Sequence, residues 1–400
     1  MLTTELIEQL FEAAHIQRWN DHIRPQGFTE LDKQAHKMII AYVLARYEED
    51  DRGAVIDWRR LIEGGIFEYL HRLVLTDIKP PIFHELMRSH GEELNQWVMK
   101  KLAPVMASQG EDFKQRFSDH FSKPTQGVLE KRILQAAHYL ATDWEFRIIY
   151  RLNQGLFGLE ETKEKIANEL EEHYHLAGVQ KLGLGKKTYQ FIDLVGQLRF
   201  QKRWAHSPRV PETSVMGHML IVAMMGYFCS LSTKACDARI VNNYFCGLFH
   251  DLPEVLTRDI ISPVKRSVEG LDELIKQIEH QQMAQRLLPL LPNAWCADLI
   301  YFTEDEFTDR IVNADGARMF VSTEALDKQY NEAKWHPVDG SLLRCCDHLA
   351  AMVEASLSIR YGVRSHQLEE GVQTMHEKYA GFFWQDLPFG EWFDAFAKNC

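Results

Sequence analysis

The chain has 400 residues, enough for about two domains, and its 46% hydrophobic and 26% charged residues are those of an ordinary globular protein. Its formal net charge of −12 argues against a broad surface that binds nucleic-acid phosphates, because such surfaces are basic. A small anionic substrate, held by a metal ion and a few cations, stays compatible with this charge.

The cysteines and the apolar runs point to the cytoplasm and away from the membrane. The 7 cysteines form no CxxC pair, which is typical of reduced thiols and does not favour zinc-ribbon chemistry. The N-terminus is acidic and lacks the basic start of a signal peptide. The longest apolar run, 219–229, is far shorter than the ~20 residues of a membrane span and indicates a core helix.

Helical spacing of apolar residues dominates the first part of the chain, and the low counts of glycine (23) and proline (13) favour helices. Start signals at Thr3-Thr4 and Thr29 open two helices, the first of which ends at Arg18-Trp19. The same spacing predicts further helices at residues 58–74, 82–106, 110–121, 127–153 and 159–174. We therefore predict an all-α fold.

A glycine-containing junction follows, and the pattern then restarts. Gly178, Gly183 and Gly185 lie in this junction. We predict a first domain over residues 1–158, a charged helix and linker over 159–187, and a second domain over 188–400.

The restart repeats the first half in order, which indicates a tandem duplication. The matching pairs are Arg18-Trp19 with Arg203-Trp204, Gly65-Ile66-Phe67 with Gly247-Leu248-Phe249, and residues 133–146 with 342–355, where Glu354 lies over Glu145. If both halves have kept their apolar frame, they are expected to pack as an intrachain pseudo-dimer. The chain is then a monomer with an internal pseudo-dimer, or a homo-oligomer.

One stretch of the second half, residues 247–265, concentrates ionisable side chains in an apolar frame. It contains His250-Asp251, and Glu254 lies one helical turn after His250. Asp259 and Lys265 follow in the same stretch. Such groups are costly to bury without partners, so their gathering here indicates a site.

The remaining parts of this site come from elsewhere in the second half. His218, His250, Asp251 and Asp347 offer two imidazoles and two carboxylates, a set that suits a divalent ion with positions left for water and substrate. Candidate ions are Mn, Co, Mg, Fe, Ni and Zn. Asp315 is a rival to Asp347, but Asp347 has an apolar frame that matches the repeat. In the first half the matching positions hold His36, Glu68-Tyr69 and His138, so most metal-binding residue types are missing there.

The other polar residues of the second half suit phosphate chemistry. Glu254 could orient or deprotonate a water, Arg203 and Lys265 could clamp a phosphate, and Asp259 could bind a sugar hydroxyl. Each of these residues also has an ordinary structural explanation. Glu254 could be a surface carboxylate, Arg203 a helix cap and Asp259 a turn residue or helix cap. Lys265 could be solvated, and Trp204 could pack in the core.

The pattern of His218, His250-Asp251 and Asp347 resembles the H…HD…D signature of the HD-domain metal-dependent phosphohydrolases. Arg203-Trp204, the run from His218 and the stretch from His250 to Lys265 are most similar to the bacterial 5'-deoxynucleotidase branch. This resemblance implies an all-helical fold, one divalent metal ion, and hydrolysis of nucleoside 5'-monophosphates, with deoxyribose preferred. It implies that Glu254 is catalytic and that Arg203, Trp204 and Asp259 contact the substrate.

A different class of function is also open. A nucleotide-sensing or scaffold protein would explain one degenerate half, and a phosphodiesterase or nucleoside triphosphate hydrolase is a variant within the enzyme class. In each case the expected partner is a small nucleotide rather than a membrane or nucleic acid.

Overall fold

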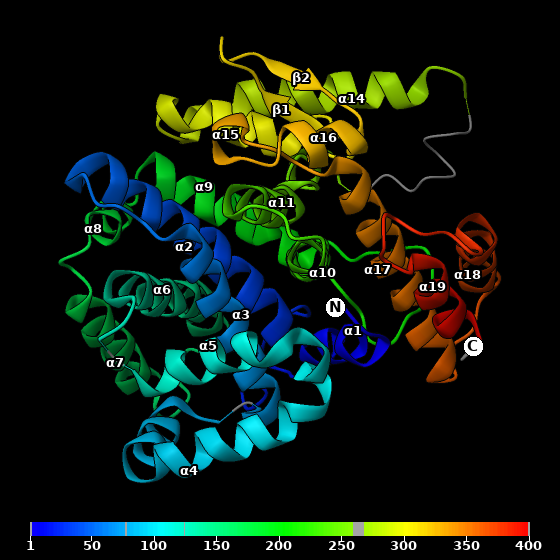
Figure 1. Ribbon diagram of the computed structural model, residues 1–400. Helices are drawn as coiled ribbons and strands as arrows, with labels where there is room; N and C mark the ends of the chain where they lie inside the picture. The colour runs from blue at the N-terminus through cyan, green and yellow to red at the C-terminus, as the bar shows by residue number, and fades with distance from the viewer. Residues whose placement is uncertain (1, 77, 124, 259–267, 399–400) are drawn as a thin grey trace. The chain divides into compact units, whose positions relative to one another are not determined.

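The computed structural model describes residues 2–76, 78–123, 125–258 and 268–398, and the chain is all-α apart from one small hairpin (Figure 1). It divides into two compact units, Met1–Gly183 and Leu184–Cys400. The predicted intrachain pseudo-dimer concerns the relation between the units and stays a prediction.

The first unit consists of helices joined by short loops. In chain order they are α1 (Thr4–Phe11), α2 (Glu30–Arg52), α3 (Trp58–Leu75), α4 (Pro80–Met106), α5 (Gly110–Ser122), α6 (Val128–Leu152), α7 (Leu159–Glu172) and α8 (Ala177–Gly183). Helices α3 to α7 agree with the predicted helices to within two residues, whereas α1 ends at Phe11 and not at Arg18-Trp19, and α8 lies in the predicted glycine-containing junction.

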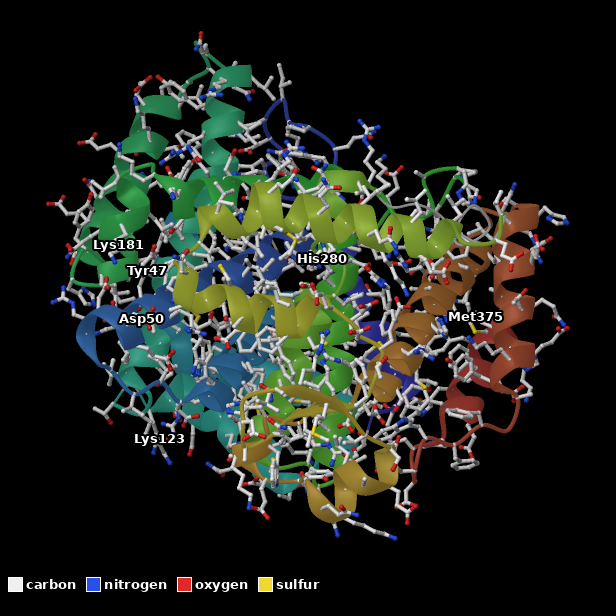
Figure 2. The ribbon with its side chains drawn as sticks, turned by 90° about the horizontal axis from the view of Figure 1, so that it is seen from above. Tyr47, Asp50, Lys123, Lys181, His280 and Met375 are labelled. Atoms are coloured by element: carbon white, nitrogen blue, oxygen red, sulfur yellow. The ribbon has the colours of Figure 1, made fainter. Side chains whose placement is uncertain are left out.

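Helix α2 is the centre of the first unit and is buried along most of its length. Its start is capped by Thr29, whose side chain accepts a hydrogen bond from the backbone of Asp32, and it ends at Gly53 in the left-handed conformation. Helices α3, α6 and α8 pack against it. In Figure 2, Lys181 of α8 lies beside Tyr47 of α2, and its ammonium is 4.4 Å from the ring centroid. The segment predicted as a charged helix and linker thus forms helices that pack within the first unit.

The second unit is also helical. Its helices are α9 (Lys187–Gly196), α10 (Val215–Ser232), α11 (Asp237–Phe249), α12 (Glu254–Thr257), α14 (Leu271–Gln282), α15 (Asn293–Thr303), α16 (Thr323–Gln329), α17 (Gly340–Arg360), α18 (His366–Tyr379) and α19 (Phe389–Lys398).

Helix α10 is the core of the second unit, with α11 and α17 packed against it. Among the described residues, α10 alone is long and apolar enough to cross a membrane. However, 89% of the segment Val215–Ser232 is buried inside the protein, as expected of a core helix. Gly247 lets α11 pack closely against α10, because a Cβ at this position would lie 2.8 Å from the Cα of Ala223 on α10. The core helix predicted around residues 219–229 is therefore present.

A two-stranded hairpin was not predicted. Strand β1 (Arg310–Val312) pairs antiparallel with β2 (Arg318–Phe320), with Ile311 opposite Met319. The connecting turn contains Asp315-Gly316, a dipeptide that favours hairpins, and this signal could have revealed the element. Three-residue strands are too short to show an alternating pattern, which is why periodicity missed them.

A buried ion pair joins α11 to the start of α17. The guanidinium of Arg239 donates to both carboxylate oxygens of Asp339, with its Nε 2.6 Å from Oδ2, and both side chains are fully buried. Asn243 donates to the same carboxylate at 2.8 Å. Because Asp339 immediately precedes α17, this pair fixes the helix that carries Asp347 relative to the helix that leads to His250.

We predict that Asp339→Asn destabilises the second unit by about 3–5 kcal/mol, because it leaves the buried Arg239 charge without its main partner. Urea unfolding followed by circular dichroism measures the change. Glu324→Gln is the control, since Glu324 pairs with Lys328 on an exposed helix face and its loss should have no measurable effect. Equal midpoints for Asp339→Asn and the parent protein would contradict the structural role of the pair.

Candidate active site

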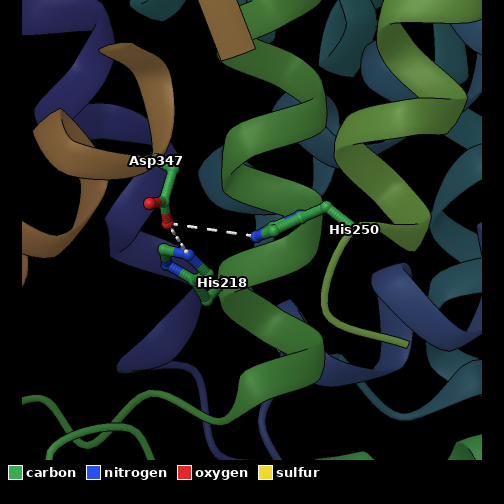
Figure 3. Close-up of side chains that lie close together, drawn as sticks. All are labelled: His218, His250 and Asp347. Carbon is green, nitrogen blue, oxygen red and sulfur yellow. Dashed lines mark hydrogen bonds and ion pairs between the residues drawn. The ribbon is translucent and has the colours of Figure 1, made fainter. Parts of the chain in front are cut away.

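Three helices of the second unit bring His218, His250 and Asp347 together (Figure 3). His218 lies on α10, His250 directly follows α11, and Asp347 lies on α17. Their ligand atoms all lie within 4.8 Å of one another. The Nε2 of His218 is 2.8 Å from Oδ1 of Asp347, and the Nε2 of His250 is 3.9 Å from the same oxygen. Residues 129 positions apart in the chain thus form one cluster.

Asp251 adds a second carboxylate beside His250. Its Oδ2 is 3.2 Å from the His250 Nε2. Helix α11 ends just before this pair because Pro253 lacks an N–H and its ring would clash with the carbonyl of Phe249 in a continued helix. The chain turns here, and the N–H of Leu252 donates to the Phe249 carbonyl at 2.9 Å. The proline therefore places the His-Asp pair at a helix end rather than inside a helix.

Opposite charges set the protonation of this cluster. Burial lowers the pKa of His250, but the carboxylates of Asp251 and Asp347 outweigh it and raise this pKa to about 9. Burial raises the pKa of Asp347, but contact with His218 and the nearby His250 outweighs it, and the result is about 2. The pKa of Asp251 is also held low, against its burial, mainly by His250. The two carboxylates thus favour a positive charge beside them, which a proton on His250 or a bound cation can supply.

The donors of the cluster fit a divalent metal ion. The Nδ1 of His250 lies 2.8 Å from the Gly247 carbonyl, so Nδ1 carries a proton, and Nε2 is the atom that offers a lone pair when the ring is neutral. This Nε2 and the Oδ2 of Asp251 are buried atoms without a hydrogen-bond partner among the described residues. The group of His218, His250 and Asp347 could hold such an ion, and Asp251 lies beside it as a second carboxylate.

A second group of polar residues surrounds Glu354, which is fully buried on α17. Its carboxylate accepts hydrogen bonds from Trp204 Nε1 at 3.1 Å and from the Thr213 hydroxyl at 2.6 Å. It also lies 3.6 Å from the Nδ1 of His218. Burial raises its pKa, but Arg209, His218 and Arg203 outweigh this and hold it below the usual range. Glu354 is therefore an ionised carboxylate that joins the cluster to the segment of Trp204.

Arg203 lies between the two groups. Its guanidinium is 3.6 Å from Asp251 and 3.9 Å from Glu354, and its side chain is 15% exposed. Trp204 has a φ of 56°, an unusual backbone conformation for a bulky residue, and its ring lies over Gly371 of α18, where a Cβ would clash. The structure thus brings the predicted Arg203-Trp204 pair to the edge of the candidate metal ligands His218, His250, Asp251 and Asp347, called the metal-ligand cluster below.

Of the other predicted site residues, the structure describes Glu254 and Asp315. Glu254 begins α12, its side chain is buried, and its N–H donates to the Asp251 carbonyl at 3.1 Å. Asp259 and Lys265 lie outside the described residues. Asp315 is exposed in the turn of the hairpin, so Asp347, and not its rival, joins His218 and His250.

Several residues at the site were not predicted. Glu354 has a match in Glu145 and follows Asp347 on the same apolar helix, but the sequence assigned it no role, although an Arg-Trp pair and a later glutamate recur together in both halves. Thr213, directly before the cap of α10, could not be recognised from spacing. Phe307, in the loop before the hairpin, packs its ring 5.9 Å from that of His250.

Comparison with known proteins agrees with this site. Residues 195–376 match the family model described as an HD domain. A 5'-deoxynucleotidase from Vibrio atlanticus (strain LGP32) is 26% identical over 168 residues, which cover 41% of this chain and 77% of that protein. No solved structure matches the chain.

The matched residues contain the whole cluster. His218, His250-Asp251 and Asp347 all lie within residues 195–376 and stand in the order that the HD signature requires. Residues 195–376 of the second unit therefore match an HD domain in both sequence and arrangement of these residues.

Proposed function

We propose that the second unit is a phosphomonoesterase that releases phosphate from nucleoside 5'-monophosphates, with 5'-deoxynucleotides as the preferred substrates. The observation that carries this proposal is the cluster of His218, His250 and Asp347 next to the Arg203-Trp204 pair. The similarity to a 5'-deoxynucleotidase supports the substrate class. The free thiols of the described cysteines are compatible with a cytoplasmic location, which belongs to the same proposal.

The ligands in this proposal are His218, His250, Asp251 and Asp347, and a bound divalent ion would polarise the phosphate and acidify a water. Arg203 would bind the substrate phosphate with its guanidinium, in the place where it now lies between two carboxylates. Glu254 would take a proton from the attacking water, and Trp204 would pack against the nucleoside. Asp259 and Lys265 keep their predicted roles, with the sugar and the phosphate. In the overall reaction water adds to phosphorus, the ester P–O bond breaks, and phosphate and the nucleoside 5'-hydroxyl result.

The second candidate function is nucleotide sensing with little turnover. It is favoured by one observation, the replacement of the metal-binding residue types in the first unit. Tight nucleotide binding without phosphate release in the presence of Mn²⁺, Co²⁺ or Mg²⁺ would establish it. Diphosphate or a monoester as the product, in place of inorganic phosphate, would indicate instead a triphosphate hydrolase or a phosphodiesterase.

We predict that Glu254→Gln lowers phosphate release from 2'-deoxynucleoside 5'-monophosphates by at least about 10²-fold, because general bases typically contribute 10²–10⁴-fold. The assay is colorimetric phosphate release with added Mn²⁺, Co²⁺ or Mg²⁺. Bound metal, measured by mass spectrometry, should be unchanged. Full activity in Glu254→Gln would assign the base to another residue, and no release by the parent protein from any nucleotide would refute the proposed activity.

Asp347→Asn should strip the protein of its metal ion, because this carboxylate is the one that approaches both His218 and His250. Elemental analysis after gel filtration measures the loss, and chelation of the parent protein should abolish activity in the same way. His280→Asn is the control, since His280 is an exposed residue paired with Glu304 (Figure 2). Metal retained at the parent level in Asp347→Asn would contradict this ligand assignment.

Glu354 should act as a positioning residue. We predict that Glu354→Gln weakens metal binding by about 10–100-fold, because the carboxylate next to the Nδ1 of His218 orients that ring. It should also raise KM, because the Trp204 indole loses its charged acceptor. Metal titration and steady-state kinetics at saturating metal separate the two effects. The control is Glu370→Gln on the exposed face of α18, and identical metal affinity in both variants would show that Glu354 has no such role.

A further inference from the structure

The first unit contains buried cations at the position that matches the metal-ligand cluster of the second unit. Thr29 caps α2 and Ser214 caps α10, and each precedes its helix in the same short antiparallel bridge, to Gln17 and Lys202 respectively. Lys33 and His218 are each the fourth residue after the cap, and their N–H groups donate to the cap carbonyls at 3.1 and 3.0 Å. Lys33, and not His36 as the sequence suggested, therefore occupies the position of His218.

His138, which contacts Lys33, matches Asp347, which contacts His218 in the second unit. His138 precedes Glu145 by the same spacing as Asp347 precedes Glu354. The Nζ of Lys33 lies 2.5 Å from the Nδ1 of His138 and 3.1 Å from its Nε2, where His218 contacts Asp347 in the second unit. A lysine–histidine contact thus stands in place of a histidine–aspartate contact.

The exchange reverses the charge of the site. In the second unit, Asp251 and Asp347 give the four matched residues a formal charge of −2 when both histidines are neutral, as they must be to bind a metal ion. In the first unit, Lys33 and Glu68 cancel, Tyr69 and His138 are neutral, and the buried Lys37 is added to the same helix face. A divalent cation therefore has no surplus of negative charge to bind there, whereas an anion has positive charge.

Lys33 is short of negative partners. Its side chain is fully buried, and within the described part of the chain it makes no ion pair closer than 4 Å. The nearest buried carboxylates, Glu30 and Glu145, are bound by Arg18, whose Nη1 is 2.9 Å from Glu30 and whose Nη2 is 2.9 Å from Glu145. Burial and the neighbouring Arg18 hold the pKa of Lys33 well below its usual range. An anion in contact with this buried amine would favour its protonated, ammonium form and bind to it.

Further cations lie close to the same point. Besides burial, the charges of Lys33, Arg72 and Lys37 hold the pKa of His138 well below its usual range. Lys37 is in contact with Glu68, whose side chain is 26% exposed, so the group reaches the surface at Glu68. The group is thus cationic and partly open to solvent.

We propose that the first unit binds the phosphate group of a phosphomonoester against Lys33, with Lys37 and Arg72 beside it. The ammonium of Lys33 would donate to a phosphate oxygen, and the dianion would supply the negative charge that Lys33 lacks. No bond is broken, and no metal ion takes part. This binding is independent of the activity proposed for the second unit, and it would let the chain respond to a nucleotide or to inorganic phosphate.

The test is calorimetric titration of the full-length, metal-free protein with inorganic phosphate and, separately, with 2'-deoxyadenosine 5'-monophosphate. We expect saturable binding that Lys33→Met weakens at least about tenfold, because the charged hydrogen bond from the ammonium to the phosphate is lost. Lys163→Met, on the exposed face of α7, is the control and should bind like the parent. Tighter binding of the nucleotide identifies it as the ligand, and equal binding identifies the phosphate group alone.

Lys33→Met is expected to fold, because an apolar chain replaces an ammonium that has no carboxylate in contact. Without ligand its melting temperature should equal or exceed that of the parent, and added phosphate should raise the melting temperature of the parent only. If this variant does not fold, crystals of the parent grown with tungstate should show an anomalous peak beside the Lys33 Nζ. The proposal is overturned by absence of saturable binding, by equal binding in parent and Lys33→Met, or by a tungstate peak only elsewhere. Each of these outcomes would mean that the Lys33 ammonium fills the position of a metal ion and binds no phosphate.

Discussion

A carboxylate buried in each unit holds together parts of the chain that are far apart. Glu354 accepts hydrogen bonds from Trp204 and Thr213 and lies next to His218, and Glu145 accepts them from Arg18 and Trp19, with the Trp19 indole at 2.8 Å. A buried charge is tolerated only when it is paired, so each carboxylate requires its Arg-Trp segment to stay close to the long helix that carries it. Trp19 and Trp204 share the same unusual backbone conformation, with φ of 55° and 56°.

Arg18 and Arg203 bind these carboxylates differently, because the first unit has Tyr69 where the second has Asp251. In the first unit Arg18 binds Glu145 through two nitrogens at 2.9–3.1 Å and reaches Glu30 as well. In the second unit Arg203 is shared between Glu354 and Asp251 at longer distances. The position of Asp251 is held by Tyr69 in the first unit, and the Tyr69 hydroxyl donates to the Leu10 carbonyl. Asp251 therefore both supplies a candidate metal ligand and draws the arginine toward the place proposed for the substrate phosphate.

Much of the fold and of the candidate site could be predicted, because both depend on strong local signals. Helical periodicity and capping residues gave the helices, and the motif residues His218, His250 and Asp347 do lie together. The match between the halves was less accurate: His36 was paired with His218, although the caps of α2 and α10 pair Lys33 with it. A shift of three residues is almost one helical turn, so it keeps the apolar face unchanged and periodicity cannot detect it. Only the hydrogen bonds at the helix starts define the register.

Pro253 shows why the two units differ beyond their ligands. It ends α11 at Phe249, so that His250 and Asp251 lie in a turn. His71 stands at the matching position of the first unit, and α3 continues through Glu68 and Tyr69 to Leu75. In a continuous helix adjacent side chains point about 100° apart, so two neighbouring residues cannot both face one small ion. Restoring a histidine and an aspartate at positions 68 and 69 would therefore not rebuild the metal-binding arrangement, because the helix end that lets both side chains reach the same point would still be missing.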